Sequence, residues 1–235
     1  MIRFIRSLLA DFADLLFPVL CLGCTNSLGE NEVILCTKCR ISMPETNQHK
    51  EPYDRNLLNK FAGKVPVQFV ASYVYFTKGG LIQKLIHSIK YKSKKEVAKE
   101  VAGWYGYQLR SESDLVKEID LIVGVPLHKS RFQQRGYNQA DWIAEGLSEA
   151  LDVPSRTDIL VCKGLKESQT HKNRLQRWEN VNTVFSVENQ LAIRDKNVVI
   201  VDDVMTTGAT IEACAVQLVR AGCKSVSVLT LATVR

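Results

Sequence analysis

The segment at residues 198–210, VVIVDDVMTTGAT, constrains the fold of this chain more than any other feature. Its four leading apolar residues predict a strand buried in a sheet. Two adjacent acids, Asp202 and Asp203, follow at the carboxyl end of that strand, and residues 206–210 then open a helix. A buried strand that passes through a tight turn into a helix is typical of parallel α/β sheets.

The same alternation of strands and helices continues over most of the chain. We therefore expect an α/β fold, an open and mostly parallel sheet flanked by helices, with ligands at the carboxyl ends of the strands. The expected strands are residues 67–76, 119–125, 159–162, 181–187, 198–201 and 226–231. The expected helices are residues 81–90, 97–109, 138–151 and 210–221.

Three parts are expected along the 235 residues. Residues 1–45 hold an amphipathic helix over 1–18 and a small cysteine-bearing unit, residues 46–66 form a polar, loose connection, and residues 67–235 form the α/β domain. No apolar run reaches the ~20 residues that span a bilayer, so no transmembrane segment is expected. The N-terminal helix is expected to pack on a neighbouring domain, with contact to a membrane surface as the alternative.

The acids and the turn of the segment at 198–210 suit a sugar phosphate. Adjacent carboxylates can accept hydrogen bonds from two neighbouring sugar hydroxyls, and backbone N–H groups at a helix N-terminus bind phosphate. The phosphate cradle would consist of Thr206, Thr207, Gly208, Ala209 and Thr210. Together these features predict a ribose 5-phosphate ligand. The alternative is a strand–turn–helix unit in which the acids only cap the helix. A Walker-type phosphate loop is excluded because its pattern is absent.

Two CxxC pairs near the N-terminus predict a structural zinc site. Cys21 and Cys24 form one pair, and Cys36 and Cys39 form the other, with eleven residues between the pairs. Four thiolates complete a tetrahedral zinc shell and leave no open position for catalysis. A unit this small does not fold without such a metal. Reduced or redox-active thiols are the alternative.

The net charge of +6 is concentrated in three basic segments, residues 78–99, 129–135 and 163–177. Together they hold fifteen Lys and Arg residues against two acids. Three such segments beside one phosphate motif favour an anionic ligand, although each could also be a solvated surface. The residues that directly follow the strand at 119–125, and that we assign to phosphate binding, are Lys129, Arg131 and Arg135.

The other basic residues are candidates for binding nucleic acid. Lysines on both sides of Tyr91 could hold phosphates while its ring stacks on a base, or Tyr91 could simply pack at the end of a helix. Two arginines lie in a stretch that could instead be a surface helix. The candidates, all outside the phosphate motif in the sequence, are Lys90, Lys92, Lys94, Lys95, Arg174 and Arg177.

The segment at 198–210 closely resembles the phosphoribosyl pyrophosphate (PRPP) motif of type I phosphoribosyltransferases. Almost the whole chain also resembles the ComF (competence protein F) family. The shared motifs are the double-CxxC ribbon, IHSIKYK at 86–92, VGVPLHKSRFQQRGYNQA at 123–140 and QTHKNRLQRWENV at 169–181.

The resemblance implies PRPP as ligand, Mg²⁺ as its companion ion, and the handling of single-stranded DNA in the cytoplasm during natural transformation. Contact with the DNA-uptake machinery would follow from that role. An active phosphoribosyltransferase, which transfers the ribosyl 5-phosphate of PRPP to an acceptor and releases pyrophosphate, is the alternative. A PRPP sensor without activity is a third hypothesis.

Overall fold

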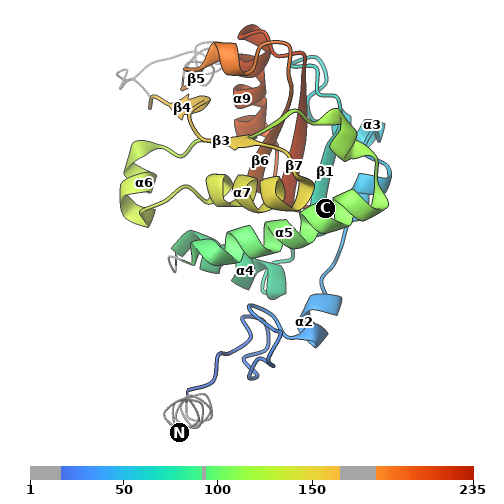
Figure 1. Ribbon diagram of the computed structural model, residues 1–235, viewed down its shortest axis with the longest axis vertical. Helices are drawn as coiled ribbons and strands as arrows, with labels where there is room; N and C mark the ends of the chain where they lie inside the picture. Colours follow the sequence, from blue (N-terminus) through green and yellow to red (C-terminus); the bar gives the residue numbers. More distant parts are fainter. Residues whose placement is uncertain (1–16, 92–93, 165–183) are drawn as a thin grey trace, which may run out of the picture.

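The computed structural model describes residues 17–91, 94–164 and 184–235, and Figure 1 shows its elements around one central sheet. The sheet has five strands in the order β1-β7-β6-β2-β3, and every neighbouring pair is parallel. β4 and β5 form a separate antiparallel pair. The expected open, mostly parallel α/β fold is therefore confirmed. The strands are β1 (Val70–Tyr75), β2 (Leu121–Gly124), β3 (Ser155–Arg156), β4 (Leu160–Cys162), β5 (Phe185–Val187), β6 (Asn197–Met205) and β7 (Ser225–Thr233).

Helices cover both faces of the sheet. α5 and α7 lie against each other on one face, and α9 packs on the other face (Figure 1). The four expected helices of the α/β domain correspond to α4, α5, α7 and α9. The α-helices are α2 (Thr37–Ile41), α3 (Arg55–Leu58), α4 (Leu81–Tyr91), α5 (Lys95–Glu112), α6 (Lys129–Arg135), α7 (Gln139–Leu151) and α9 (Ala209–Arg220). Short 3-10 helices are η1 (Gln48–Lys50), η2 (Leu115–Glu118) and η3 (Gln190–Ala192).

The apolar residues at the start of β6 contribute side chains to both faces of the sheet. Side chains of successive strand residues point to opposite sides of a sheet. Val199 and Val201 join the core that holds α4, α5 and α7, whereas Val198 and Ile200 join the core that holds α9. All four side chains are buried. Because burying one such side chain is worth ~1.5–3 kcal/mol, this run holds β6 in the middle of the sheet.

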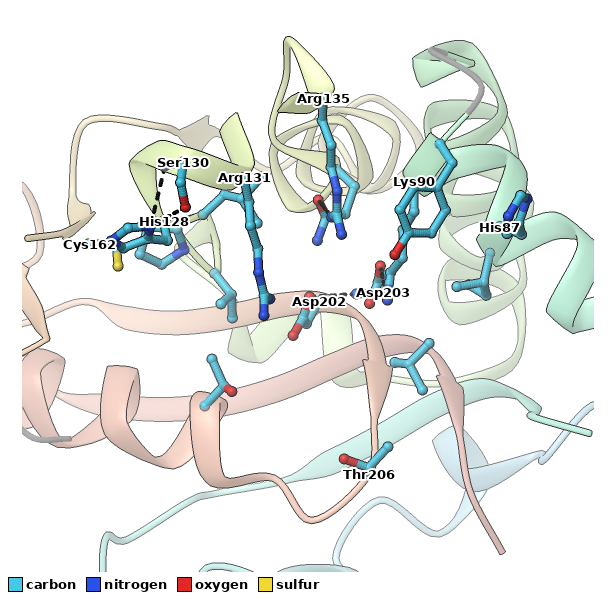
Figure 2. Close-up of a pocket in the computed structure, with 18 of the residues that line it drawn as sticks. His87, Lys90, His128, Ser130, Arg131, Arg135, Cys162, Asp202, Asp203 and Thr206 are labelled. Carbon is cyan, nitrogen blue, oxygen red and sulfur yellow. Dashed lines mark hydrogen bonds and ion pairs between the residues drawn. The ribbon is translucent and has the colours of Figure 1, made fainter. Parts of the chain in front are cut away.

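A crevice lies between the carboxyl ends of β2 and β6 (Figure 2). The pairing of these two strands ends at Gly124 and Val201. The chain leaves β2 through α6 and α7 toward β3 on one side, and it leaves β6 through α9 toward β7 on the other side. Neighbouring parallel strands whose connections turn in opposite directions leave a crevice in which ligands bind. The strand order alone therefore places a candidate site here.

β6 is longer than the predicted strand. We expected it to end at Val201, but it runs to Met205 because β7 pairs with it as far as Thr233. Asp202 and Asp203 therefore lie within a paired strand rather than after it. Pairing with β7 holds the backbone from which both carboxylates project.

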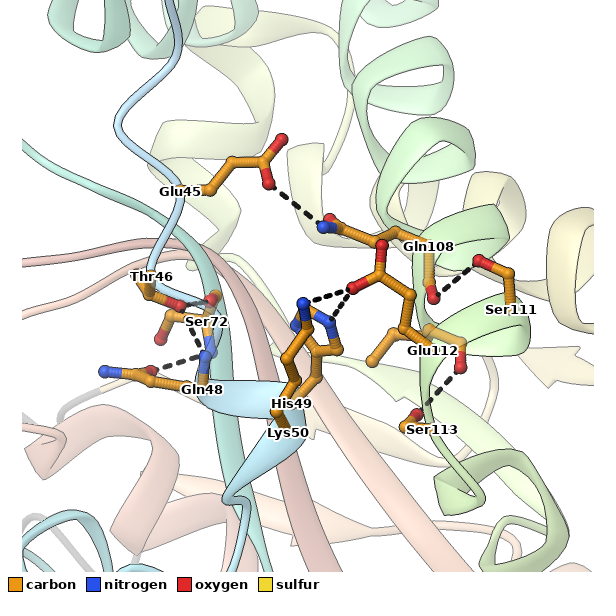
Figure 3. Close-up of polar contacts among 11 residues, drawn as sticks. Glu45, Thr46, Gln48, His49, Lys50, Ser72, Gln108, Ser111, Glu112 and Ser113 are labelled. Atoms are coloured by element: carbon orange, nitrogen blue, oxygen red, sulfur yellow. Dashed lines mark hydrogen bonds and ion pairs between the residues drawn. The ribbon is translucent and has the colours of Figure 1, made fainter.

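The connection at residues 46–66 is folded against the domain and is not loose. Figure 3 shows His49 and Lys50 of η1 both reaching Glu112 of α5, at 3.1 and 2.9 Å. Phe61 is only 1% exposed and joins the core under α9. The polar composition of this stretch gave no indication of these few contacts, which is why we expected a loose connection.

Several expectations concern residues outside the described part of the chain. Residues 1–16 of the expected helix over 1–18 are among them, as are Lys92, Arg174 and Arg177. β3 was not predicted, because two residues carry no recognisable strand pattern. None of the helices in the described ranges is long and apolar enough to cross a membrane.

Candidate functional site

The crevice holds a cavity of about 1080 Å³. Its walls come from the end of β6, the turn into α9, the segment around α6, and α4 (Figure 2). The structure thus brings the predicted acids, part of the predicted phosphate turn and two of the predicted arginines into one space. The charged and hydroxyl side chains among the lining residues used below are Lys90, Arg131, Arg135, Asp202, Asp203, Thr206 and Thr210.

The two acids at the floor of the cavity have different surroundings. Asp203 is 3% exposed, and its carboxylate forms an ion pair with the ammonium of Lys90, at 3.0 Å between Oδ2 and Nζ. The carboxylate of Asp202 accepts a hydrogen bond of 2.8 Å from the backbone N–H of Asp203. Burial and the neighbouring charge of Asp203 raise the pKa of Asp202 to about 7, although Lys90 and Arg135 act in the opposite direction. Such a pair can accept hydrogen bonds from two adjacent hydroxyls when both groups are ionised.

The turn between β6 and α9 holds the residues that we predict to form a phosphate cradle. Gly208 has φ of 80°, in the left-handed region, and a Cβ there would lie 3.2 Å from the ring of Phe61. Glycine is therefore favoured here, because other residues rarely adopt this φ and a Cβ would crowd the ring of Phe61. The residues from Thr206 to Thr210 line a small hollow of about 40 Å³ beside the main cavity. The first N–H groups of a helix have no partner within the helix and can bind an anion. In α9, the N–H of Ala209 donates a long bond of 3.4 Å to the hydroxyl of Thr207.

The opposite wall carries the two predicted arginines, both on α6. The side chain of His128 accepts a bond from Ser130 N at 3.3 Å and so caps the N-terminus of α6. Arg131 and Arg135 project from α6 toward the two acids (Figure 2). Lys129, which we grouped with them, is exposed and lies outside the cavity lining.

α4 supplies a third wall that is largely aromatic. The rings of His87 and Tyr91 lie 4.9 Å apart, and the guanidinium of Arg135 is 5.4 Å from the Tyr91 ring. Phe76, just after β1, also lines the cavity. A planar group could lie against this wall while an anion meets the arginines.

The structure separates Lys90 from the other nucleic-acid candidates. Lys90 belongs to the cavity, because it pairs with Asp203, and so it is not part of an outer basic surface. Lys94 is exposed at the start of α5, and the ammonium of Lys95 lies 4.4 Å from the ring centre of Trp142. Of the candidates in the described ranges, only these two remain on the surface.

Sequence analysis missed several lining residues. Gln83 and His87 share one face of α4 with Lys90 and Tyr91, at helical spacings of four, seven and eight residues. The opposite face is the buried apolar one. This periodicity was the available signal, since a polar face on a helix next to a phosphate motif predicts a site wall. Other missed residues with polar or sulfur-containing side chains are His128, Ser130, Gln139 and Cys162.

The four N-terminal cysteines form one cluster. The sulfur atoms of Cys21, Cys24, Cys36 and Cys39 all lie within 4.8 Å of one another. Four sulfurs at ~2.3 Å from a zinc ion would be roughly 3.8 Å apart, so the cluster fits a tetrahedral metal with small adjustments. The spacing of the CxxC pairs therefore predicted the correct grouping.

The electrostatics of the cluster also fit a cation. Burial opposes ionisation of Cys21, but backbone N–H groups, including those of Cys36 and Gly23, lower the pKa of its thiol to about 6. Burial and the neighbouring sulfurs raise the pKa of Cys39 to about 12. Ionisation of all four thiols thus requires a positive ion among them.

The chain is similar to several known proteins. The Phosphoribosyl transferase domain model matches residues 142–235. The chain is 30% identical over 146 residues to the DNA utilization protein YhgH of Salmonella typhimurium, which covers 61% of this chain and 63% of the relative. It is 35% identical over 118 residues to Competence protein F of Haemophilus influenzae, which covers 48% of this chain and 50% of the relative. The solved glutamine PRPP amidotransferase of B. subtilis matches 61% of this chain and 30% of its own, with a TM-score of 0.43 and 20% identity.

The two curated relatives are matched over less than two thirds of their length. The chain is a homologue of the competence protein F and YhgH proteins. It carries a phosphoribosyl transferase domain in its C-terminal part and a four-cysteine cluster near its N-terminus. The family resemblance stated from the sequence motifs is thereby confirmed.

Proposed function

We propose that this competence protein F homologue binds PRPP, together with Mg²⁺, in the cavity between β2 and β6. One observation carries the proposal: an acid pair, a phosphate-type turn and two arginines face one space of about 1080 Å³. Each part matches one part of PRPP. The acids suit the ribose hydroxyls, the turn suits the 5-phosphate, and the arginine forks suit the diphosphate.

The acid pair also fits a magnesium ion. Mg²⁺ prefers carboxylate and phosphate oxygens, and it commonly binds through one or two carboxylates plus the phosphates of a ligand. Asp202 and Asp203 are the only carboxylates among the described residues that line the cavity, and Oδ2 of Asp203 has no hydrogen bond beyond its ion pair with Lys90. The ion would neutralise part of the charge on the diphosphate.

Calorimetry with the wild-type protein tests the proposal. We expect PRPP to bind in the presence of Mg²⁺ and to bind more weakly when the ion is chelated. Ribose without phosphate should not bind measurably, because it reaches neither the turn nor the arginines. Equal weak heats for PRPP and ribose would contradict the assignment.

A second candidate function is transfer of the ribosyl 5-phosphate to an acceptor. The aromatic wall formed by Phe76, His87 and Tyr91 favours it, since a planar acceptor could stack there. The bond between C1 and the diphosphate would break as a bond from C1 to the acceptor forms. Release of diphosphate from PRPP, followed by phosphorus NMR, separates this function from binding alone.

We further propose that the protein handles single-stranded DNA in the cytoplasm; two of its relatives are named for DNA utilization and for competence. The cavity suits DNA poorly, because a deoxyribose in a strand lacks the two free hydroxyls that the acids would bind. DNA should therefore contact the outer basic residues near the start of α5 and on α6. Lys94, Lys95 and Lys129 lie there outside the cavity lining.

Lys94→Glu combined with Lys95→Glu is expected to weaken binding of single-stranded DNA by at least about tenfold at low salt. Each phosphate contact contributes about −0.7 to the log–log salt slope, so the slope should become less steep by about 1.4. The affinity for PRPP should stay the same. The matched control is Lys196→Glu with Lys224→Glu, which reverses two exposed lysines at the amino ends of β6 and β7. Equal DNA affinities for the two double variants would contradict a DNA surface at α5.

A further inference from the structure

The ion pair between Lys90 and Asp203 links α4 to the floor of the cavity. The side chain of Asp203 is 5% exposed and that of Lys90 is 26% exposed. Lys90 is thus partly withdrawn from water, and its ammonium covers a carboxylate that a sugar hydroxyl would have to reach. A ligand that binds Asp203 through Oδ2 must therefore displace Lys90.

The backbone at Lys90 is held in place while its side chain can move. Ile89 is fully buried, and its carbonyl accepts a hydrogen bond from the hydroxyl of Tyr137 at the start of α7. The last turn of α4 is thereby tied to the segment that follows α6. A lysine on a fixed backbone still has four flexible carbons, so its ammonium can travel several ångströms.

A displaced ammonium in this position needs a new anion. A half-buried charge without a partner is costly. The other cations of the lining, Arg131 and Arg135, reach the same space from the opposite wall (Figure 2). The charge of Lys90 also acts on Asp202, but Asp202 would bind the sugar as well. The anion left for Lys90 is therefore a group of the ligand that lies between α4 and α6.

We infer that Lys90 moves from Asp203 to a second anionic group of the ligand when the sugar binds. This inference rests on the proposed function, and it deepens it: the cavity selects ribose 5-phosphates that carry a further phosphate or diphosphate at C1. Ribose 5-phosphate, which lacks that group, displaces Lys90 without giving it a partner. Lys90 is in this sense a specificity-determining residue.

The test compares two ligands on three variants by calorimetry with Mg²⁺. Lys90→Met should lower the affinity for PRPP by about tenfold or more, since one charge-assisted contact is lost. Its affinity for ribose 5-phosphate should be unchanged or higher, because Asp203 is no longer covered. Lys90→Arg should restore the preference for PRPP. The control Lys78→Met removes the same charge from an exposed position outside the cavity.

The outcomes distinguish the two proposals. In one outcome, the ratio of the PRPP affinity to the ribose 5-phosphate affinity in Lys90→Met stays within threefold of the wild-type ratio. That result would overturn the role of Lys90 but would leave the proposed PRPP site intact. Wild-type protein that binds neither ligand overturns both. Retained binding of ribose 5-phosphate by Lys90→Met shows at the same time that the variant is folded.

Discussion

Asparagine at both Asp202 and Asp203 is expected to lower the affinity for PRPP with Mg²⁺ by at least about tenfold. Each carboxylate would accept a charge-assisted hydrogen bond from a sugar hydroxyl, worth roughly 1.5–3 kcal/mol. Asparagine preserves the shape of the side chain but not its charge. Isothermal calorimetry measures the change. Equal affinities of the wild type and the double variant would remove the acid pair from the site.

A matched control is available elsewhere in the chain. Asp152→Asn combined with Asp195→Asn removes two charges from exposed positions outside the cavity. Both residues have φ near +58°, at 58° and 57°, where asparagine is as well tolerated as aspartate. This control should bind PRPP as the wild type does. A parallel loss in both double variants would point to net charge instead of the site.

The single variant Asp202→Asn adds a pH test of the same site. The pKa of Asp202 is raised from 3.8 to about 7, first by burial and then by Asp203. Below pH 7 the acid is protonated and is a weaker acceptor, so PRPP affinity should rise between pH 6 and pH 8 in the wild type. That part of the pH dependence should disappear in Asp202→Asn.

The raised pKa of Asp202 also predicts the stability of Asp202→Asn, so a loss of binding in this variant can be distinguished from unfolding. Because the folded protein holds the proton to higher pH than the unfolded chain does, ionisation of Asp202 lowers the free energy of unfolding as pH rises from about 4 to 7. Asp202→Asn should therefore melt at the same or a higher temperature than the wild type at pH 8. A lower melting temperature would show that the ionised group stabilises the fold.

Features of the site that depend on neighbouring residues in the sequence were predictable, whereas features that depend on contacts between distant residues were not. The apolar start of β6 and the turn at Gly208 are encoded locally, and both were predicted. The continuation of β6 through Asp202 and Asp203 depends on β7, so it could not be inferred from two polar residues. The pairing of Lys90 with Asp203 joins distant parts of the chain through the sheet and α4. From the sequence, Lys90 was assigned to nucleic-acid binding together with the other lysines of its basic segment.

The packing of the cysteine unit against the rest of the protein also could not be predicted from the sequence. Its CxxC spacing predicted the cluster, and its size suggested a separate module. In the structure, Cys21 and Leu35 are buried in the same core as Ile82 and Leu85 of α4. The carbonyl of Gly23 also accepts a bond of 2.7 Å from Lys84 on that helix. The unit is therefore part of the support for α4, which forms one wall of the cavity.

Loss of the metal is expected to unfold this unit. We expect one zinc ion per chain in freshly purified, reduced protein, and Cys36→Ser should lose it. The unit has one five-residue helix and otherwise consists of turns and loops, so we expect the metal to hold its four sulfurs together. Metal analysis and limited proteolysis should show zinc absent and new cleavage within residues 17–45.

The matched control for that variant is Cys223→Ser. Cys223 is half-buried at the end of α9 and lies far along the chain from the cluster, so its loss should leave zinc and protease resistance unchanged. Because α4 packs on the cysteine unit, Cys36→Ser should also weaken PRPP binding, although none of the four clustered cysteines lines the cavity. Cys36→Ser with a full zinc content would contradict the metal site. A variant that loses zinc but binds PRPP normally would show that α4 keeps its position without the metal.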